Sequence, residues 1–211
     1  MKRLLTLSLA LVFCGTAAAD HHKKGEHDGP PSKAVCVLLP TVGSQVRGTI
    51  MFEEKDGKVH VTGKVSGLTP NGKHGFHIHE FGDLSDLQEG KSTGGHFSPG
   101  GHQHGKPSDS ADKRHIGDLG NLEADGSGVA TIDMTDEVID LHGAESIIGR
   151  GIVVHKGEDK FTQPTGDAGG RAAIGVIGIA KDEMMKKTEM KKEETGRAGG
   201  PPKPTAADAN N

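Results

Sequence analysis

The chain has 211 residues and carries 25 basic against 29 acidic side chains, which gives a formal net charge of −4 at pH 7. Without an excess of basic residues, it lacks the electrostatic pattern of a nucleic-acid-binding protein. The length suits one domain, and because aromatic residues make up only 3%, with neither Trp nor Tyr, the core must consist of Val, Ile, Leu and a few Phe.

Residues 1–19 have the pattern of a secretory signal peptide. A basic start is followed by an apolar run from Leu4 to Phe13 and by small residues that end at Ala19. The apolar run is about half as long as the roughly 20 residues that a membrane span needs, so we expect cleavage after Ala19 and no stable membrane insertion. The sequence therefore predicts an exported protein, periplasmic or extracellular.

Polar segments flank the predicted folded unit, which spans residues 34–180. Residues 20–33 are polar and contain histidines. After cleavage, the new amine of Asp20 and the ring of His22 would form a possible Cu(II) chelate, although a solubilising polar terminus explains these residues as well. Residues 181–211 are charged and then rich in Gly, Pro and Ala, without apolar periodicity, so a disordered tail is expected.

The folded unit contains short β-prone runs separated by Gly, Asp and Asn clusters. Eight such runs occur, at residues 33–39, 46–54, 58–67, 74–80, 117–124, 129–134, 150–155 and 172–180. Asp56-Gly57 and Asp125-Gly126 predict tight turns between neighbouring strands. The pattern predicts an all-β fold, an antiparallel barrel or sandwich.

Alternation along the strands sorts several histidines. In one run, Phe76 and Ile78 take one face and His77 and His79 take the other. The apolar pair belongs in the core, so both imidazoles project outward together. The same alternation points His155 outward at the end of a later run.

Two connections are too long for hairpins, Phe81 to Ile116 and Lys156 to Arg171, and loops of that length usually carry function. The first holds four histidines and is followed by Asp118. A single histidine is more often a surface or hydrogen-bonded residue than a ligand, but this loop together with the outward histidines of the strands is hard to explain as solvated surface. Imidazole suits zinc and copper, and a lone carboxylate among histidines suits zinc more than copper, so a metal centre is predicted.

Five motifs resemble the copper/zinc superoxide dismutases. They are GFHIHEFGD from Gly75, HFSP from His96, RHIGDLGN from Arg114, IIGRGIVVH from Ile147 and GDAGGRAAIGVIGIA from Gly166. They follow the order of the family between about residue 33 and residue 180. The resemblance implies an eight-stranded antiparallel Greek-key β-barrel, a sandwich-like fold with two long functional loops.

The resemblance also implies the role of each site residue. The implied copper ligands are His77, His79, His96 and His155, and the implied zinc ligands are His96, His104, His115 and Asp118. Asp159 would orient a copper ligand and a zinc ligand, and Arg171 would attract the anion beside the copper; an exposed loop Asp and a surface Arg are the alternatives. His74 resembles a structural core histidine, whereas the histidines without a counterpart are expected at the surface, namely His60, His102 and His142.

The activity that the resemblance implies is dismutation of the superoxide anion to O₂ and H₂O₂ by alternating Cu(II) and Cu(I), with His96 supplying a proton. Copper and zinc are the expected cofactors, and Lys156 and Lys160 are candidates for steering the substrate. An exported copper-buffering or copper-delivery protein on the same barrel is the alternative. The residues that resemble the apolar patch of dimeric relatives, and so predict a homodimer, are Phe81-Gly82, Ile148-Gly149 and Ile179.

Cysteine is the clearest departure from the family. Cleavage removes Cys14 and leaves Cys36 as the only thiol, so no intrachain disulfide is expected. The resemblance places the disulfide of the family near Gly90 and at Ile174, and neither residue is Cys. We therefore expect metal binding, rather than a covalent bridge, to hold the first long connection on the barrel.

Overall fold

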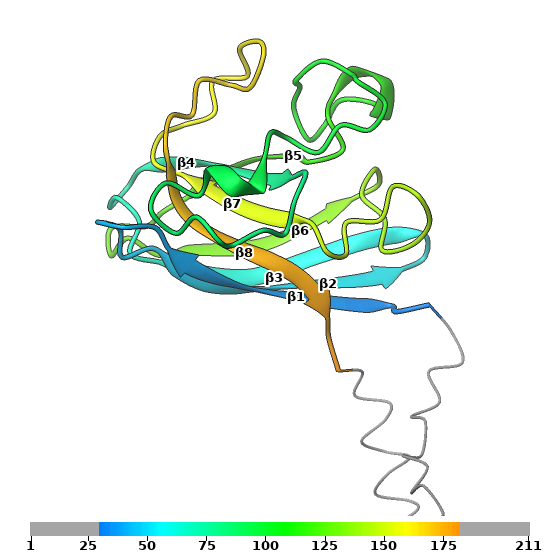
Figure 1. The fold of residues 1–211 in the computed structure, drawn as a ribbon, viewed down its shortest axis with the longest axis horizontal. Helices are drawn as coiled ribbons and strands as arrows, with labels where there is room; N and C mark the ends of the chain where they lie inside the picture. Colours follow the sequence, from blue (N-terminus) through cyan, green and yellow to red (C-terminus); the bar gives the residue numbers. More distant parts are fainter. Residues whose placement is uncertain (1–29, 182–211) are drawn as a thin grey trace, which may run out of the picture.

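Each of the eight β-prone runs forms a strand in the computed structural model, which describes residues 30–181 (Figure 1). The strands of this part are β1 Lys33–Pro40, β2 Arg47–Lys55, β3 Lys58–Ser66, β4 Lys73–His79, β5 Asp118–Glu123, β6 Ala130–Asp136, β7 Gly151–His155 and β8 Arg171–Ile179. Its helical segments are two three-residue 3-10 turns, Lys91–Thr93 and Ala111–Lys113, and within residues 30–181 no helix is long and apolar enough to cross a membrane. The predicted signal peptide, most of the polar segment 20–33 and all but the first residue of the tail 181–211 lie outside the described residues.

All strand pairs are antiparallel, and within residues 30–181 hydrogen bonds join them in the order β5-β4-β7-β8-β1-β2-β3-β6. The two end strands, β5 and β6, also contact each other, which nearly closes the sheet into a barrel. Strand β4 lies beside β7, and β1 beside β8, although these partners are far apart in the chain, as in a Greek key. The predicted fold class is confirmed.

The two predicted turns join their strands in different ways. Asp56 and Gly57 have positive φ angles of 54° and 72° and connect β2 to β3, which pair along their whole length, so this turn makes a hairpin. At the second turn, the N–H of Gly128 donates to the carbonyl of Asp125 at 3.0 Å. It joins β5 to β6, the two ends of the sheet order, and so lies at the seam of the barrel.

The register of β4 and β7 separates the core from the outer face of the sheet. Phe76 lies opposite Val154, and both are buried in the core. His77 lies opposite Val153 and shares the outer face with it. The predicted alternation is therefore present, but His77 is 0% exposed because the first loop (residues 80–117) and the second loop (residues 156–170) cover this face. The second loop and the later part of the first loop stand above the layer that holds β4 and β5, whereas the earlier part of the first loop lies alongside β7 and β8 (Figure 1).

Candidate metal centre

The first group of ligand atoms comes from β4, β7 and the first loop. It contains His77, His79, His96 and His155, all buried, with one ring nitrogen of each lying within 4.8 Å of the others. Three of these nitrogens, Nδ1 of His77 and Nε2 of His79 and of His155, are shielded from solvent and have no hydrogen-bond partner. Buried ring nitrogens without partners are costly, so they fit a metal ion as their missing partner.

The opposite nitrogens of the same three rings are all occupied. Nε2 of His77 donates to Oδ2 of Asp159 at 2.9 Å, and Nδ1 of His79 donates to the carbonyl of Gly94 at 2.9 Å. Nδ1 of His155 donates to the carbonyl of Gly169 at 3.0 Å. Each acceptor fixes the proton on the far side of its ring, which leaves a lone pair on the nitrogen that faces the group.

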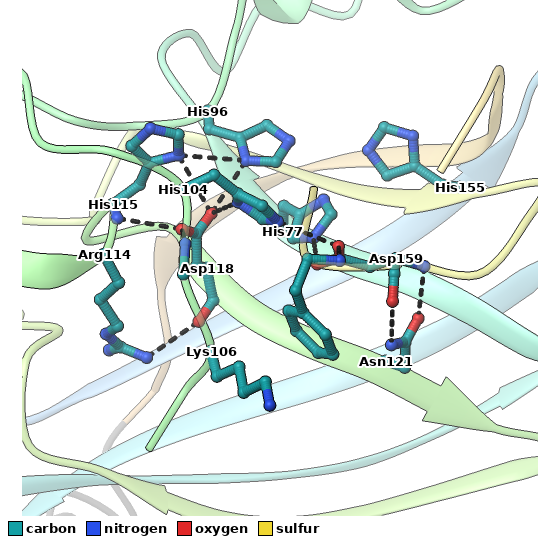
Figure 2. Close-up of polar contacts among 12 residues, drawn as sticks. His77, His96, His104, Lys106, Arg114, His115, Asp118, Asn121, His155 and Asp159 are labelled. Carbon is teal, nitrogen blue, oxygen red and sulfur yellow. Dashed lines mark hydrogen bonds and ion pairs between the residues drawn. The ribbon is translucent and has the colours of Figure 1, made fainter. Parts of the chain in front are cut away.

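The second group surrounds one carboxylate oxygen, Oδ1 of Asp118 (Figure 2). Nδ1 of His96 lies 2.9 Å from it, Nδ1 of His104 lies 3.0 Å from it, and Nδ1 of His115 lies 3.2 Å from it. The Nδ1 atoms of His96 and His115 are 3.4 Å apart. Tetrahedral zinc with bonds of about 2.0–2.1 Å separates its ligand atoms by roughly 3.3 Å, so these four donors fit zinc. His96 belongs to both groups.

The orientation of Asp118 is set by its own backbone surroundings. Its second oxygen, Oδ2, accepts the N–H groups of Gly105 and His115, each at 2.9 Å, and this turns Oδ1 toward the three rings. Arg114 is fully buried: its Nη1 donates to the carbonyl of Asp118 at 2.8 Å, and its Nη2 donates to both carboxylate oxygens of Asp136 at 2.6 and 2.7 Å. The start of β5 is thereby tied to the end of β6 at the seam of the barrel.

Asp159 connects the two groups. Its Oδ2 accepts from Nε2 of His77 and its Oδ1 accepts from Nε2 of His104, both at 2.9 Å. Asn121 on β5 holds Asp159 in place, since it accepts the N–H of Asp159 at 2.8 Å and donates to its carbonyl at 2.9 Å (Figure 2). Although His77, His104 and Asp159 also lie close enough to share an ion, both nitrogens point at Asp159 as donors, so the carboxylate orients the rings.

The second loop makes three further contacts with His104, two hydrogen bonds and one ring stacking. The side-chain amide of Gln163 donates to the carbonyl of His104 at 2.7 Å and accepts its N–H at 3.1 Å. The ring of Phe161 stacks on that of His104, with centroids 6.2 Å apart and planes 15° apart. The ammonium of Lys106 lies over the ring of Phe161, 5.6 Å from its centroid. Sequence reasoning missed Gln163, Phe161 and Asn121, because nothing in the spacing along the chain shows which loop residues meet a ligand from another loop.

Burial keeps three of the rings neutral. Removal from water lowers the pKa of His96 to about 4 and that of His155 to about 3, and it lowers the pKa of His79 well below its ordinary value. A neutral imidazole has a lone pair to offer. These three rings are therefore in the protonation state that metal binding requires.

His104 behaves differently because it lies between two carboxylates. Burial disfavours its charged form, but the hydrogen bonds to Asp118 and Asp159 outweigh burial and raise its pKa to about 9. Burial raises the pKa of both carboxyl groups, yet their hydrogen bonds with His104 and the neighbouring histidines hold each below its ordinary value. The second group thus attracts positive charge, which a bound cation supplies as well as a proton does.

A polar cavity of about 380 Å³ opens beside the first group. Its walls include His79, His96, His155, Lys91, Lys156 and Arg171. Arg171 donates to the carbonyl of Gly90, to Oγ1 of Thr93 at 2.8 Å and to the carbonyl of Gly94 at 2.5 Å, so it both faces the cavity and holds the first loop. Lys160 instead pairs with Asp167 at 2.8 Å and does not line the cavity.

The remaining histidines of residues 30–181 lie outside both groups. His74 is buried, with Nδ1 donating to the carbonyl of His155 at 2.9 Å and Nε2 accepting the N–H of Thr69 at 3.2 Å, as suits a structural histidine. His102 is exposed, and His60 and His142 are half-buried.

Gly90 and Ile174, which stand where the family has its disulfide, lie next to each other. A Cβ atom added to Gly90 would lie 2.8 Å from Cγ2 of Ile174, so the two residues expected to replace the cysteines of the family do meet across the first loop and β8. Cys36, the free cysteine of residues 30–181, is buried elsewhere, on β1.

Two comparisons with known proteins agree with this geometry. Residues 46–177, well over half of the chain, match the family described as copper/zinc superoxide dismutase. A crystal structure of the clock protein EA4 is similar with a TM-score of 0.65 and 45% sequence identity, over 72% of this chain and 97% of that chain. The chain belongs to the copper/zinc superoxide dismutase family.

Proposed function

We propose that this protein is an exported superoxide dismutase. The observation that carries the proposal is the arrangement of four buried imidazoles at a polar cavity, with Arg171 in the cavity wall. His77, His79, His96 and His155 would hold copper, and His96, His104, His115 and Asp118 would hold zinc. Copper would supply a one-electron change between Cu(II) and Cu(I), and zinc a fixed positive charge.

The side chains of the cavity wall would bind and protonate the substrate. Three N–H groups of the Arg171 guanidinium donate to acceptors of the first loop, so the remaining N–H groups are available to an anion. Lys156 adds positive charge at the same wall, whereas Lys160 is neutralised by Asp167. His96 would hold the transferred proton on Nε2, since Nδ1 faces Asp118.

The test combines metal analysis with a superoxide-consumption assay. We expect the protein with bound copper and zinc to consume superoxide, and His155→Ala to lose at least 100-fold of that rate while keeping the circular dichroism of the barrel, because the ring lies outside the core. His102→Ala is the matched control, since His102 is exposed and belongs to neither group, and its rate should not change. Near-parental activity of His155→Ala would contradict the copper assignment.

A second candidate is a metal-binding protein that uses the barrel without turnover. It is favoured by the similarity to EA4, which is described as a clock protein rather than by an activity. In that case the protein would bind both metals as above, yet it would not consume superoxide. With a chelator present to remove free metal ions, superoxide would disappear at the same rate with and without the protein.

The proposed export depends on residues 1–19. It is tested by determining the N-terminal sequence of the protein that its own cells secrete.

A further inference from the structure

A separate group of metal-ligating side chains lies at another place on the barrel. It consists of Glu54, near the end of β2, and of Asp140 and His142, in the loop between β6 and β7. One ligand atom from each lies within 4.8 Å of the others. None of the three residues belongs to the histidine groups described above.

The loop presents Asp140 and His142 on one side. Ile139 and Leu141 are buried in the core, so the residues that alternate with them face away from it. The backbone is held by hydrogen bonds: the N–H of Ile147 donates to the carbonyl of Asp140 at 2.9 Å, and the N–H of His142 donates to Oδ1 of Asp140 at 2.8 Å. This fixes the carboxylate of Asp140 and leaves Oδ2 for another ligand.

Glu54 and His142 meet in a way that a simple hydrogen bond does not explain. Oε2 of Glu54 is shielded from solvent and lies 2.6 Å from Nε2 of His142, within ion-pair distance, but the contact does not have the geometry of a hydrogen bond. Nδ1 of His142 is likewise buried without a partner. A carboxylate oxygen in this position is stabilised by a cation, and an imidazole with two carboxylates is a ligand set that suits zinc.

We propose that Glu54, Asp140 and His142 form an additional zinc site, with water completing the coordination shell. Tetrahedral zinc separates its ligand atoms by roughly 3.3 Å for bonds of about 2.0–2.1 Å, so the 2.6 Å between Nε2 and Oε2 must open by less than an ångström. The two side chains are 32% and 29% exposed, which leaves them free to rotate by that amount. A bound ion would tie the end of β2 to the loop that leads into β7.

The test is a calorimetric titration of Zn²⁺ into the full chain already loaded with copper and zinc, with the three N-terminal histidines, His21, His22 and His27, replaced by Gln so that they do not contribute. We expect one further saturable site. It should disappear in His142→Gln and weaken at least tenfold in Glu54→Gln. It should persist in His60→Gln, a control on strand β3 whose half-buried histidine contacts Thr135. Excess Ca²⁺, which prefers six to eight oxygen ligands, should not compete.

An unchanged titration of His142→Gln would overturn the proposal and leave Glu54 and His142 as an ion pair only. Loss of the site in His60→Gln would overturn it as well, because the zinc would then bind diffusely to surface histidines. If His142→Gln does not keep the melting temperature of the parent, Asp140→Asn takes its place, since Asp140 is exposed. The measured quantity is heat of zinc binding, so the outcome is independent of any superoxide turnover.

Discussion

The rings of His77, His79, His104 and His155 share one arrangement: an acceptor holds one nitrogen, and the other faces a ligand group. Rotation of a ring would break a hydrogen bond to a buried acceptor, which costs about 1–3 kcal/mol for the group left unsatisfied. The tautomer and the direction of each ring are therefore set by the protein chain itself, in advance of metal binding.

Gln163 is expected to position His104 for zinc binding, because its side-chain amide holds the backbone of that residue. Gln163→Ala removes both hydrogen bonds to the backbone of His104 while leaving every ligand in place, so zinc affinity should fall about 10-fold to 100-fold, as for other residues that orient metal ligands. Competition with a coloured zinc chelator measures this directly. Gln103→Ala, an exposed residue of the first loop that precedes His104, is the control. Equal zinc affinity in both variants would show that the amide of Gln163 does not position His104.

Cys36 should be chemically inert in the folded protein. It is fully buried, and burial raises the pKa of its thiol to about 12, so almost no thiolate is present at neutral pH. In the form that begins at Asp20, a thiol-reactive dye should label none of the native protein and one thiol per chain in denaturant. Rapid labelling of the native protein would mean that β1 opens locally.

At the scale of secondary-structure elements, the first loop is the segment that the disulfide of the family would attach to β8, and here that bridge is absent. Its contacts with the barrel include those of Arg171 with Gly90, Thr93 and Gly94 and those of the ligands of the second group, besides backbone hydrogen bonds such as the one from Phe97 to Ile78. A bridge between residues 90 and 174 would contribute roughly 4 to 5 kcal/mol in the chain-entropy description. Here Gly90 and Ile174 lie next to each other without such a bridge, so hydrogen bonds hold the loop, and we expect metal ligation to add to them.

We therefore expect the melting temperature to respond to zinc and not to reductant. Reductants that spare the metals should leave it unchanged, because residues 30–181 contain no disulfide. Selective removal of zinc should lower it by at least about 10 °C, which corresponds to roughly 3 kcal/mol or more for a domain of this size. Differential scanning calorimetry with each treatment decides the matter. A melting temperature that barely moves without zinc would show that Arg171 and packing suffice.

The strands were predictable from the sequence, whereas the contacts between loops were not. Alternation of Phe76 and Ile78 with His77 and His79 is a local property, and it correctly separates the core from the ligand face. That His77 would be buried as completely as Phe76 depends on two loops folding over the outer face, which period-two patterning does not encode. The amide of Gln163 meets His104 across 59 positions of sequence, and no local signal marks such a pair.

At the scale of the whole molecule, one face of the β1–β8 pair carries exposed apolar side chains. The register that pairs Cys36 with Ile177 sets Val37 beside Val176 on the outer face. Val37 is 57% exposed, and at the rim Phe81 is 54% exposed. Exposed apolar patches often mark contact surfaces, so we propose that a second copy of the chain covers this one.

The dimer prediction can be tested at Ile179, which is 60% exposed and pairs with Ala34 at the start of β1. We expect the parent to sediment as a dimer and Ile179→Lys as a monomer, because a buried lysine without a partner opposes association. Val42→Lys is the matched control: Val42 is 59% exposed but follows the opposite end of β1. A monomeric parent, or an Ile179→Lys variant that remains dimeric, would contradict the assignment of this face.

The carboxylate of Asp159 accepts a hydrogen bond from one ring of each ligand group, so an ion bound at one group can change the affinity of the other group for its ion. An ion held at one group fixes Asp159, which in turn fixes the ring that serves the other. Thermodynamic reciprocity then applies: whatever factor a resident zinc adds to the affinity for copper, a resident copper adds to the affinity for zinc. We expect this side chain of the second loop to couple the loading of the two ions, so that partly filled molecules are rarer than independent binding would allow.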